Sequence, residues 1–242
     1  MPEHVVLQSR RSIAPMRPAI PLWGAPGARL GRLRSGPAPT FPVYLVHAER
    51  SARIELTRDL TAAGFEPRPF ADVYDLAAAL PELAPGCVVV DIKAVTPDAA
   101  ILCDEDGDGT LLFPTILLFS HLEPKEAIAA VRLGAVDLLH RPVPLNELVA
   151  ALRRAAPKVV ELELRVSAWS AKAAIETLTP REREVLNCIM HGLANKEIAR
   201  RLGISPRTIE MHRANLYRRL SVTSLAGLLA VAYRAQDAEP LS

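Results

Sequence analysis

Marked helix starts near the C-terminus constrain the fold of this chain more than any other feature of its sequence. Residues 179–182 read Thr-Pro-Arg-Glu: the threonine can cap a helix, the proline suits its first position, and the glutamate can reach back to the cap. Ser205-Pro206 repeats the combination of cap and proline, and Thr223 or Ser224 can cap a last helix. The end of the chain is therefore expected to form a small four-helix domain.

The turn between the second and third of these helices is short. It spans Leu202–Ser205 and contains Gly203, which is free to take a positive φ. The apolar faces that flank this turn consist of Ile198, Ala199 and Leu202 on the second helix and Ile209, Leu216 and Leu220 on the third. The opposite face of the third helix carries arginines. Two helices joined by a glycine turn, with arginines on the second, have the geometry that enters a DNA major groove.

Three segments of this region closely resemble the helix-turn-helix of LuxR/NarL/FixJ-type regulators. They are Leu-Thr-Pro-Arg-Glu-Arg-Glu-Val-Leu (178–186), the stretch 192–202 with Asn-Lys-Glu-Ile-Ala at 195–199, and Ile-Ser-Pro-Arg-Thr-Ile-Glu-x-His (204–212). The resemblance extends over residues 178–233 and assigns the motif proper to Asn195–Ala214. It implies a transcription regulator that binds double-stranded DNA.

The resemblance also implies roles for individual residues. Glu210, Met211 and Ala214 match positions that face base edges, where Glu210 could accept from a cytosine amino group and Met211 could contact a thymine methyl group. The phosphate-facing matches are Lys196, Arg207, Thr208 and Arg213, and the candidate DNA-binding set also includes Ser205 and Tyr217. Thr208 and His212 could instead brace the domain.

The last helix, expected over Ser224–Ala235, has an apolar row that suits either the core or a partner. Members of the resembled family use the equivalent helix for dimerisation, so the resemblance implies a homodimer that reads two half-sites. The dimerisation candidates are Leu225, Leu228, Leu229 and Ala232.

Strands and helices alternate upstream of this region. Short apolar runs predict five strands, at Val43–Val46, Glu66–Phe70, Cys87–Asp91, Thr115–Phe119 and Val136–Leu139. Helices are predicted over residues 49–63, 73–80, 125–133 and 145–155. Two prolines place the strand at 66–70 on an edge. The alternation predicts an α/β fold, a doubly wound parallel sheet with helices on both faces.

The same patterns divide the chain. Residues 1–40 are rich in Pro, Arg and Gly and are interpreted as a mostly disordered basic leader. The α/β domain is expected over 41–156, and Pro157 is expected to end that domain. A linker over 157–175, which could be helical and has apolar residues available for docking, then leads to the all-α helix-turn-helix domain at 176–239.

Over residues 41–156 the chain resembles a response-regulator receiver, through the segments 87–91, 114–118, 134–137 and 140–143. The resemblance makes Asp91 the phosphoacceptor candidate. In a working receiver an acidic pair helps to hold magnesium, and a Ser/Thr and a Lys complete the pocket. Here His47 and Ala48 replace the acidic pair beside Glu49, while Phe119 followed by Ser120 stands at the Ser/Thr position and Arg141 at the Lys position.

These replacements predict a degenerate receiver, because an imidazole and a methyl group cannot replace two carboxylates as magnesium ligands. Regulation independent of phosphorylation is the leading interpretation, and a sensor or regulatory protein is a candidate partner at the receiver. The alternatives are a conventional regulator phosphorylated at Asp91, and an adaptor that uses its receiver fold to bind a partner. Arg141-Pro142 is a candidate cis bond, as the resemblance implies.

Charge and composition narrow the classes of protein to which this chain could belong. Residues 41–156 carry ten basic and seventeen acidic side chains, whereas 178–220 carry nine and four, which suggests a regulatory module joined to a nucleic-acid module. No apolar run is long enough for a membrane helix, and three widely spaced cysteines suit a reduced cytoplasm. The acidic loop 104–111 lacks the glutamate that ends a calcium loop. No metal, cofactor or enzymatic activity is expected.

Overall fold

A five-stranded parallel sheet forms the centre of the N-terminal domain in the computed structural model, which describes residues 41–92 and 111–238. The spatial order is β2-β1-β3-β4-β5. The strands are β1 (Pro42–Val46), β2 (Glu66–Phe70), β3 (Cys87–Asp91), β4 (Thr115–Phe119) and β5 (Asp137–His140). Both the predicted fold class and the edge position of β2 are confirmed. The predicted leader and most of the acidic loop lie outside the described residues.

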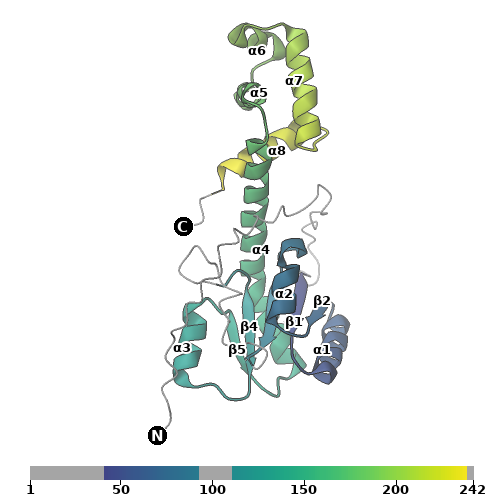
Figure 1. Ribbon diagram of the computed structural model, residues 1–242, viewed down its shortest axis with the longest axis vertical. Helices are drawn as coiled ribbons and strands as arrows, with labels where there is room; N and C mark the ends of the chain where they lie inside the picture. The colour runs from purple at the N-terminus through teal and green to yellow at the C-terminus, as the bar shows by residue number, and fades with distance from the viewer. Residues whose placement is uncertain (1–40, 93–110, 239–242) are drawn as a thin grey trace.

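Alternation of side chains along the strands builds a core on each face of the sheet. On β1, Val43 and Leu45 pack with Leu60 of α1 (Arg50–Ala62) and Leu148 of α4 (Leu145–Glu176). The intervening Tyr44 and Val46 pack on the other face, against Val73 and Leu76 of α2 (Val73–Ala79), which the short 3-10 turn η1 (Leu80–Glu82) follows. Figure 1 shows α3 (Pro124–Arg132) near β4 and β5, at the end of the sheet opposite α1.

Helix α4 is a single helix of 32 residues that runs from the sheet to the C-terminal domain. The prediction that this helix ends at residue 155 was wrong, because α4 continues through Pro157 and the segment expected as a linker. Proline removes one helical hydrogen bond and crowds the preceding turn, at a cost of about 3 kcal/mol. Its neighbours Leu152, Ala155, Ala156 and Val159 are buried in the core, whereas Pro157 itself is exposed. Burial on both sides of the proline outweighs the local penalty.

The C-terminal domain contains four helices around its own apolar core. They are α5 (Pro180–Met190), α6 (Asn195–Leu202), α7 (Pro206–Arg219) and α8 (Leu225–Gln236). Gly203 ends α6 with φ 66° and ψ 32°, the left-handed conformation that glycine adopts without strain. The chain turns at this glycine from α6 toward α7. Ile198, Ile209, Leu216 and Leu228 are fully buried in the shared core.

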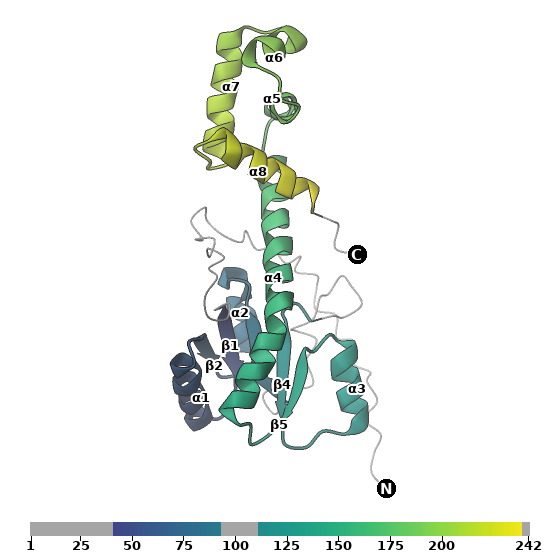
Figure 2. The ribbon, with the colours of Figure 1, turned by 180° about the vertical axis from the view of Figure 1, so that it is seen from behind.

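Helix α8 crosses the upper part of α4 (Figure 2). Arg234 Nη1 of α8 donates to Ser167 Oγ of α4 at 3.2 Å. Ala174 and Ile175 of α4 also pack against the core of the C-terminal domain. The last turns of α4 therefore belong to the C-terminal domain as much as its first turns belong to the sheet. Within the described part of the chain, none of the helices combines the length and the apolar character needed to cross a bilayer.

Candidate functional site

Asp91, His47 and Arg141 meet at the carboxyl edge of the sheet. Asp91 ends β3, His47 follows β1 and Arg141 follows β5. Because the strands are parallel, their carboxyl ends lie along one edge and bring these three side chains together. Asp91 and His47 are only 2% and 3% exposed. The pocket therefore places a carboxylate and an imidazole out of water, with a guanidinium beside them.

Both basic groups approach the same oxygen of Asp91. Arg141 Nη1 donates to Asp91 Oδ2, and His47 Nε2 lies 3.1 Å from that oxygen. The N–H of His47 is not directed at the oxygen, so this second contact is electrostatic more than a directional hydrogen bond. Burial lowers the pKa of His47, although Asp91 acts to raise it; Arg141 adds to the lowering. The pocket therefore favours a neutral imidazole beside an Asp91–Arg141 ion pair.

Backbone and side-chain contacts fix the segment between β1 and α1. The amide of Glu49 donates to His47 Nδ1 at 3.1 Å, so the proton of the neutral ring lies on Nε2. Arg53 Nη1 donates to the carbonyl oxygens of His47 and Ala48, at 2.5 and 2.8 Å. The Glu49 carboxylate is exposed and accepts from Ser51 Oγ at 2.5 Å. The one acidic residue of this segment thus contacts the first turn of α1.

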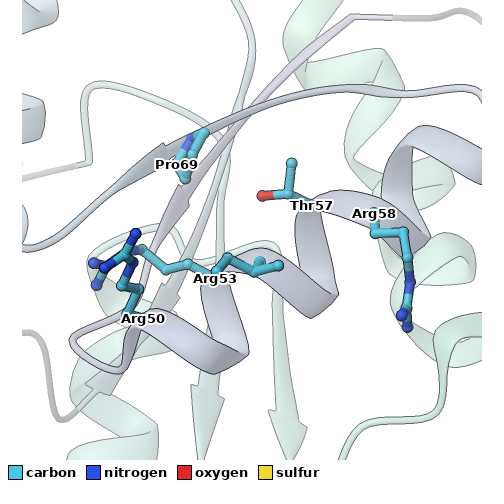
Figure 3. A pocket seen from close by; sticks show the side chains of 6 residues that line it. Arg50, Arg53, Thr57, Arg58 and Pro69 are labelled. Atoms are coloured by element: carbon cyan, nitrogen blue, oxygen red, sulfur yellow. The ribbon is translucent and has the colours of Figure 1, made fainter.

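Arg53 also lines a hollow of about 410 Å³ on the outer surface of the domain. The hollow lies between α1 and β2 and is lined by Arg50, Arg53, Ile54, Thr57, Arg58 and Pro69 (Figure 3). Arg58 points away from the other two arginines and pairs with Asp59. None of the predicted site residues lines this hollow.

An aromatic ring stands beside the pocket at the end of β4. Phe119 packs edge-on against His140, with ring centroids 5.4 Å apart. Its carbonyl oxygen accepts from the amide of Arg141 at 2.7 Å, which ties the ends of β4 and β5 together. Ser120 is half-buried in the next position. The predicted cis bond is confirmed at Arg141-Pro142.

The C-terminal domain begins with a reciprocal capping box. Thr179 Oγ1 accepts from the amide of Glu182, and Glu182 Oε2 accepts from the amide and hydroxyl of Thr179, both at 2.9 Å. Glu182 is 3% exposed, and its Oε1 lies 3.4 Å from Arg219 Nε of α7. Burial raises the pKa of Glu182, but the contacts with Thr179 and the charge of Arg219 outweigh burial and leave the pKa lowered. This carboxylate joins the start of α5 to the end of α7.

An exposed stripe runs along α7. Steps of three or four residues connect Arg207 with Glu210 and Met211, and connect these two with Ala214, which places all four on one face of the helix. The four side chains are exposed, as is Lys196 on α6. Met211 is 56% exposed, so its apolar side chain is open to a partner surface. The Thr208 hydroxyl lies 2.8 Å from Ser205 Oγ, at the start of the helix.

Arg213 and Tyr217 lie beside this stripe and contact each other. Arg213 Nη2 donates to the Tyr217 hydroxyl oxygen, and Nη1 donates to Asn195 Oδ1 on α6, both at 3.1 Å. The guanidinium carbon lies 6.0 Å from the centroid of the Tyr217 ring. Both side chains are half-buried.

The sequence of the C-terminal domain matches the family model of bacterial regulatory proteins of the luxR family over residues 176–232. The transcriptional regulatory protein FixJ of Bradyrhizobium diazoefficiens is 35% identical over 197 residues, which cover 80% of this chain and 95% of FixJ. The chain is a response regulator of the LuxR and FixJ type. FixJ of Rhizobium meliloti is 33% identical over 193 residues, which cover 79% of this chain and 95% of that protein. The crystal structure of full-length FixJ from B. japonicum has 33% sequence identity to this chain and a TM-score of 0.45. The match covers 82% of this chain and 99% of that FixJ chain.

A receiver domain implies a bound magnesium ion, and the pocket of this response regulator does not fit one. Magnesium prefers carboxylate oxygens in an octahedral arrangement. Asp91 already accepts from a guanidinium, and its buried neighbour His47, which follows β1, is an imidazole whose Nδ1 accepts from an amide. Among the residues that the structure describes, no group of three His, Cys, Asp or Glu side chains is placed to hold a metal.

The predicted dimerisation residues of the response regulator separate into two groups. Leu228 and Ala232 are 0% and 1% exposed and belong to the core of the domain. Leu229 is half-buried and packs against the same core, whereas Leu225 is 45% exposed. Leu228 and Ala232 therefore stabilise the monomer, and Leu225 is the candidate that remains open to a partner.

Proposed function

We propose that this response regulator is a sequence-specific transcription regulator that inserts α7 into the major groove of double-stranded DNA. The observation that supports this function is the exposed stripe of Arg207, Glu210, Met211 and Ala214 on a helix whose other face is buried. The stripe contains only one arginine. In this interface cationic side chains such as Lys196 and Arg207 position the helix on phosphates, while Glu210 and Met211 contact base edges.

The same proposal includes regulation that does not depend on phosphorylation. Phosphoryl transfer to Asp91 needs a carboxylate oxygen open to the phosphodonor and a cation that neutralises the developing charge. In this pocket Arg141 and His47 approach the same oxygen of Asp91, and Phe119 supplies no hydroxyl at the position where a receiver has one. Arg141 supplies the positive charge beside Asp91, so the pocket is neutralised without magnesium.

A homodimer completes the proposal, because two copies can read two half-sites of one DNA duplex. The exposed Leu225, at the start of α8, is the residue of that helix best placed to contact a second copy. A sensor or regulatory protein that binds the receiver domain is the proposed source of input.

DNA recognition is tested by selecting duplexes from a random library with the wild-type chain and measuring the affinity of a selected duplex against salt. We expect one enriched sequence and an affinity that falls steeply with salt, since several phosphates are contacted. Glu210→Ala should relax the preference at one base pair, at a cost of roughly 1–3 kcal/mol. An affinity insensitive to salt, or no enriched sequence, would contradict the proposal.

Phosphorylation is tested by incubating the wild-type chain and Asp91→Asn with acetyl phosphate and separating them on Phos-tag gels. We expect the two proteins to migrate alike, because the pocket lacks the ligands of a magnesium ion. A stoichiometric shift of the wild type that Asp91→Asn abolishes would show a conventional receiver, while leaving the proposed DNA recognition intact.

A further inference from the structure

Arg213 is the one residue of the predicted phosphate-facing set whose guanidinium the structure shows bonded to two neighbouring side chains. One end of the guanidinium donates to Asn195, the first residue of α6, and the other donates to Tyr217, one turn further along α7. The plane of the group also lies near the ring of Tyr217. The side chain thus connects the two helices of the helix-turn-helix, and its partner Tyr217 packs against their shared apolar core.

We propose that Arg213 is a positioning residue, which acts through Asn195 and Tyr217 to fix the angle between α6 and α7, and not a phosphate contact. This inference rests on the proposed binding to DNA. Its consequence is that the stripe of Glu210, Met211 and Ala214 is presented at one fixed orientation. Asn195 and Tyr217 share this role, and Asn195 was not among the DNA-binding residues predicted from the sequence.

The chemistry of the guanidinium explains why an arginine is needed here. Its planar fork can donate to two acceptors in different directions, whereas the lysine ammonium is a compact point charge on a flexible stem. A lysine at position 213 would keep the positive charge but could not hold Asn195 and Tyr217 together. A phosphate contact would behave differently, because lysine binds phosphate well.

The exposed Arg207 provides the matched control. It lies at the start of α7 on the stripe itself, and its guanidinium is open to a phosphate. Loss of one phosphate contact lowers the slope of log affinity against log salt by about one. Loss of a positioning residue lowers the affinity while leaving the number of phosphate contacts, and so the slope, unchanged.

The experiment measures fluorescence anisotropy of the full chain on a duplex that the wild type has selected from a random library, over a range of salt. We expect Arg213→Lys and Asn195→Ala each to weaken binding about tenfold without changing the salt slope. The double variant should bind about as well as either single variant, because both remove the same connection. Arg207→Ala, which removes a proposed phosphate contact, should lower the slope by about one.

Wild-type affinity for Arg213→Lys, together with a slope lowered by about one for Arg213→Ala, would overturn the inference and make Arg213 a phosphate contact. Additive losses in the double variant would also overturn it. Tyr217→Phe removes only a hydroxyl, so it is readily compatible with folding; it should weaken binding severalfold in the wild type and have no further effect in Arg213→Lys. If the wild type selects no duplex, the proposed function fails independently of this inference.

Discussion

His47 contacts the residue that precedes α1 through one of its ring nitrogens. In the neutral ring Nε2 carries the proton, while Nδ1 accepts from the amide of Glu49, the residue that precedes the first turn of the helix. A second proton must go to Nδ1, so it removes this hydrogen bond and also charges a buried ring. The groups that act on the ring are Asp91 and Glu49, which favour the charge, and Arg141 and Arg53, which oppose it. Burial decides the balance in favour of the neutral form.

We predict that the receiver domain loses stability as the pH falls below the ordinary pKa of histidine, about 6.5. The folded chain holds the pKa of His47 below that value, so in this range the unfolded chain binds the additional proton more readily. His47→Gln cannot titrate, so its free energy of unfolding should change less between about pH 7 and pH 5. The measurement is urea unfolding at both pH values. An equal change in the two proteins would remove His47 as the cause.

Glu182 acts in the same direction as His47, but at lower pH. The folded domain lowers its pKa, so the stabilisation by this carboxylate is present above the ordinary value of 4.5 and is lost as the pH falls through the folded value. The loss lies below the range assigned to His47, so unfolding at about pH 5 separates the two groups.

At the scale of elements, the sequence predicts those features that depend on local chemistry. The caps at Thr179 and Ser205, the edge strand with its two prolines and the order of strands and helices all follow from neighbouring residues, and the structure agrees. Helix α4 is the exception. The proline rule is local, whereas the burial of Ala155, Ala156 and Val159 depends on how the helix packs on the sheet.

The candidate sites likewise contain some contacts that the sequence predicts and others that it does not. Asp91, His47 and Arg141 could be brought together from the sequence because parallel strands end at one edge. Two other contacts could not be predicted from the sequence. Arg53 contacts the carbonyl oxygens of residues 47 and 48, and Arg213 contacts Asn195, and both contacts depend on the reach of a long side chain across a folded surface. No spacing rule connects residues 195 and 213.

Helix α4 leads to a prediction at this scale. Pro157→Ala should raise the free energy of unfolding by on the order of 1 kcal/mol or more, because it removes the proline penalty from a helix interior. Pro157 is exposed, so the change removes no buried contact. Lys158→Ala, the exposed neighbour, is the matched control and should change stability little. Urea unfolding followed by circular dichroism measures both variants. A neutral or destabilising Pro157→Ala would indicate that α4 is not continuous in solution.

On the scale of the whole molecule, α4 belongs to both domains. Leu148 and Leu152 of its first half are buried against the sheet, while Ala168 and Ala171 are buried in the half that α8 crosses. Its first turn also begins four residues after Arg141, which contacts Asp91. A helix that starts at the pocket and ends in the core of the DNA-binding domain connects the two sites without a flexible joint.

This arrangement predicts that the contact between α4 and α8 can be weakened without disturbing the sheet. Ala168→Glu places a charge at a position that is 7% exposed, and a buried charge without a partner costs several kcal/mol. We expect amide hydrogen exchange in α8 to accelerate about a hundredfold, while exchange in β3 stays unchanged, because local opening follows local stability. Arg165→Glu on the exposed side of α4 is the matched control and should leave both rates unchanged. Equal acceleration in α8 and β3 would show that the two domains open together, and no acceleration would place α8 away from α4 in solution.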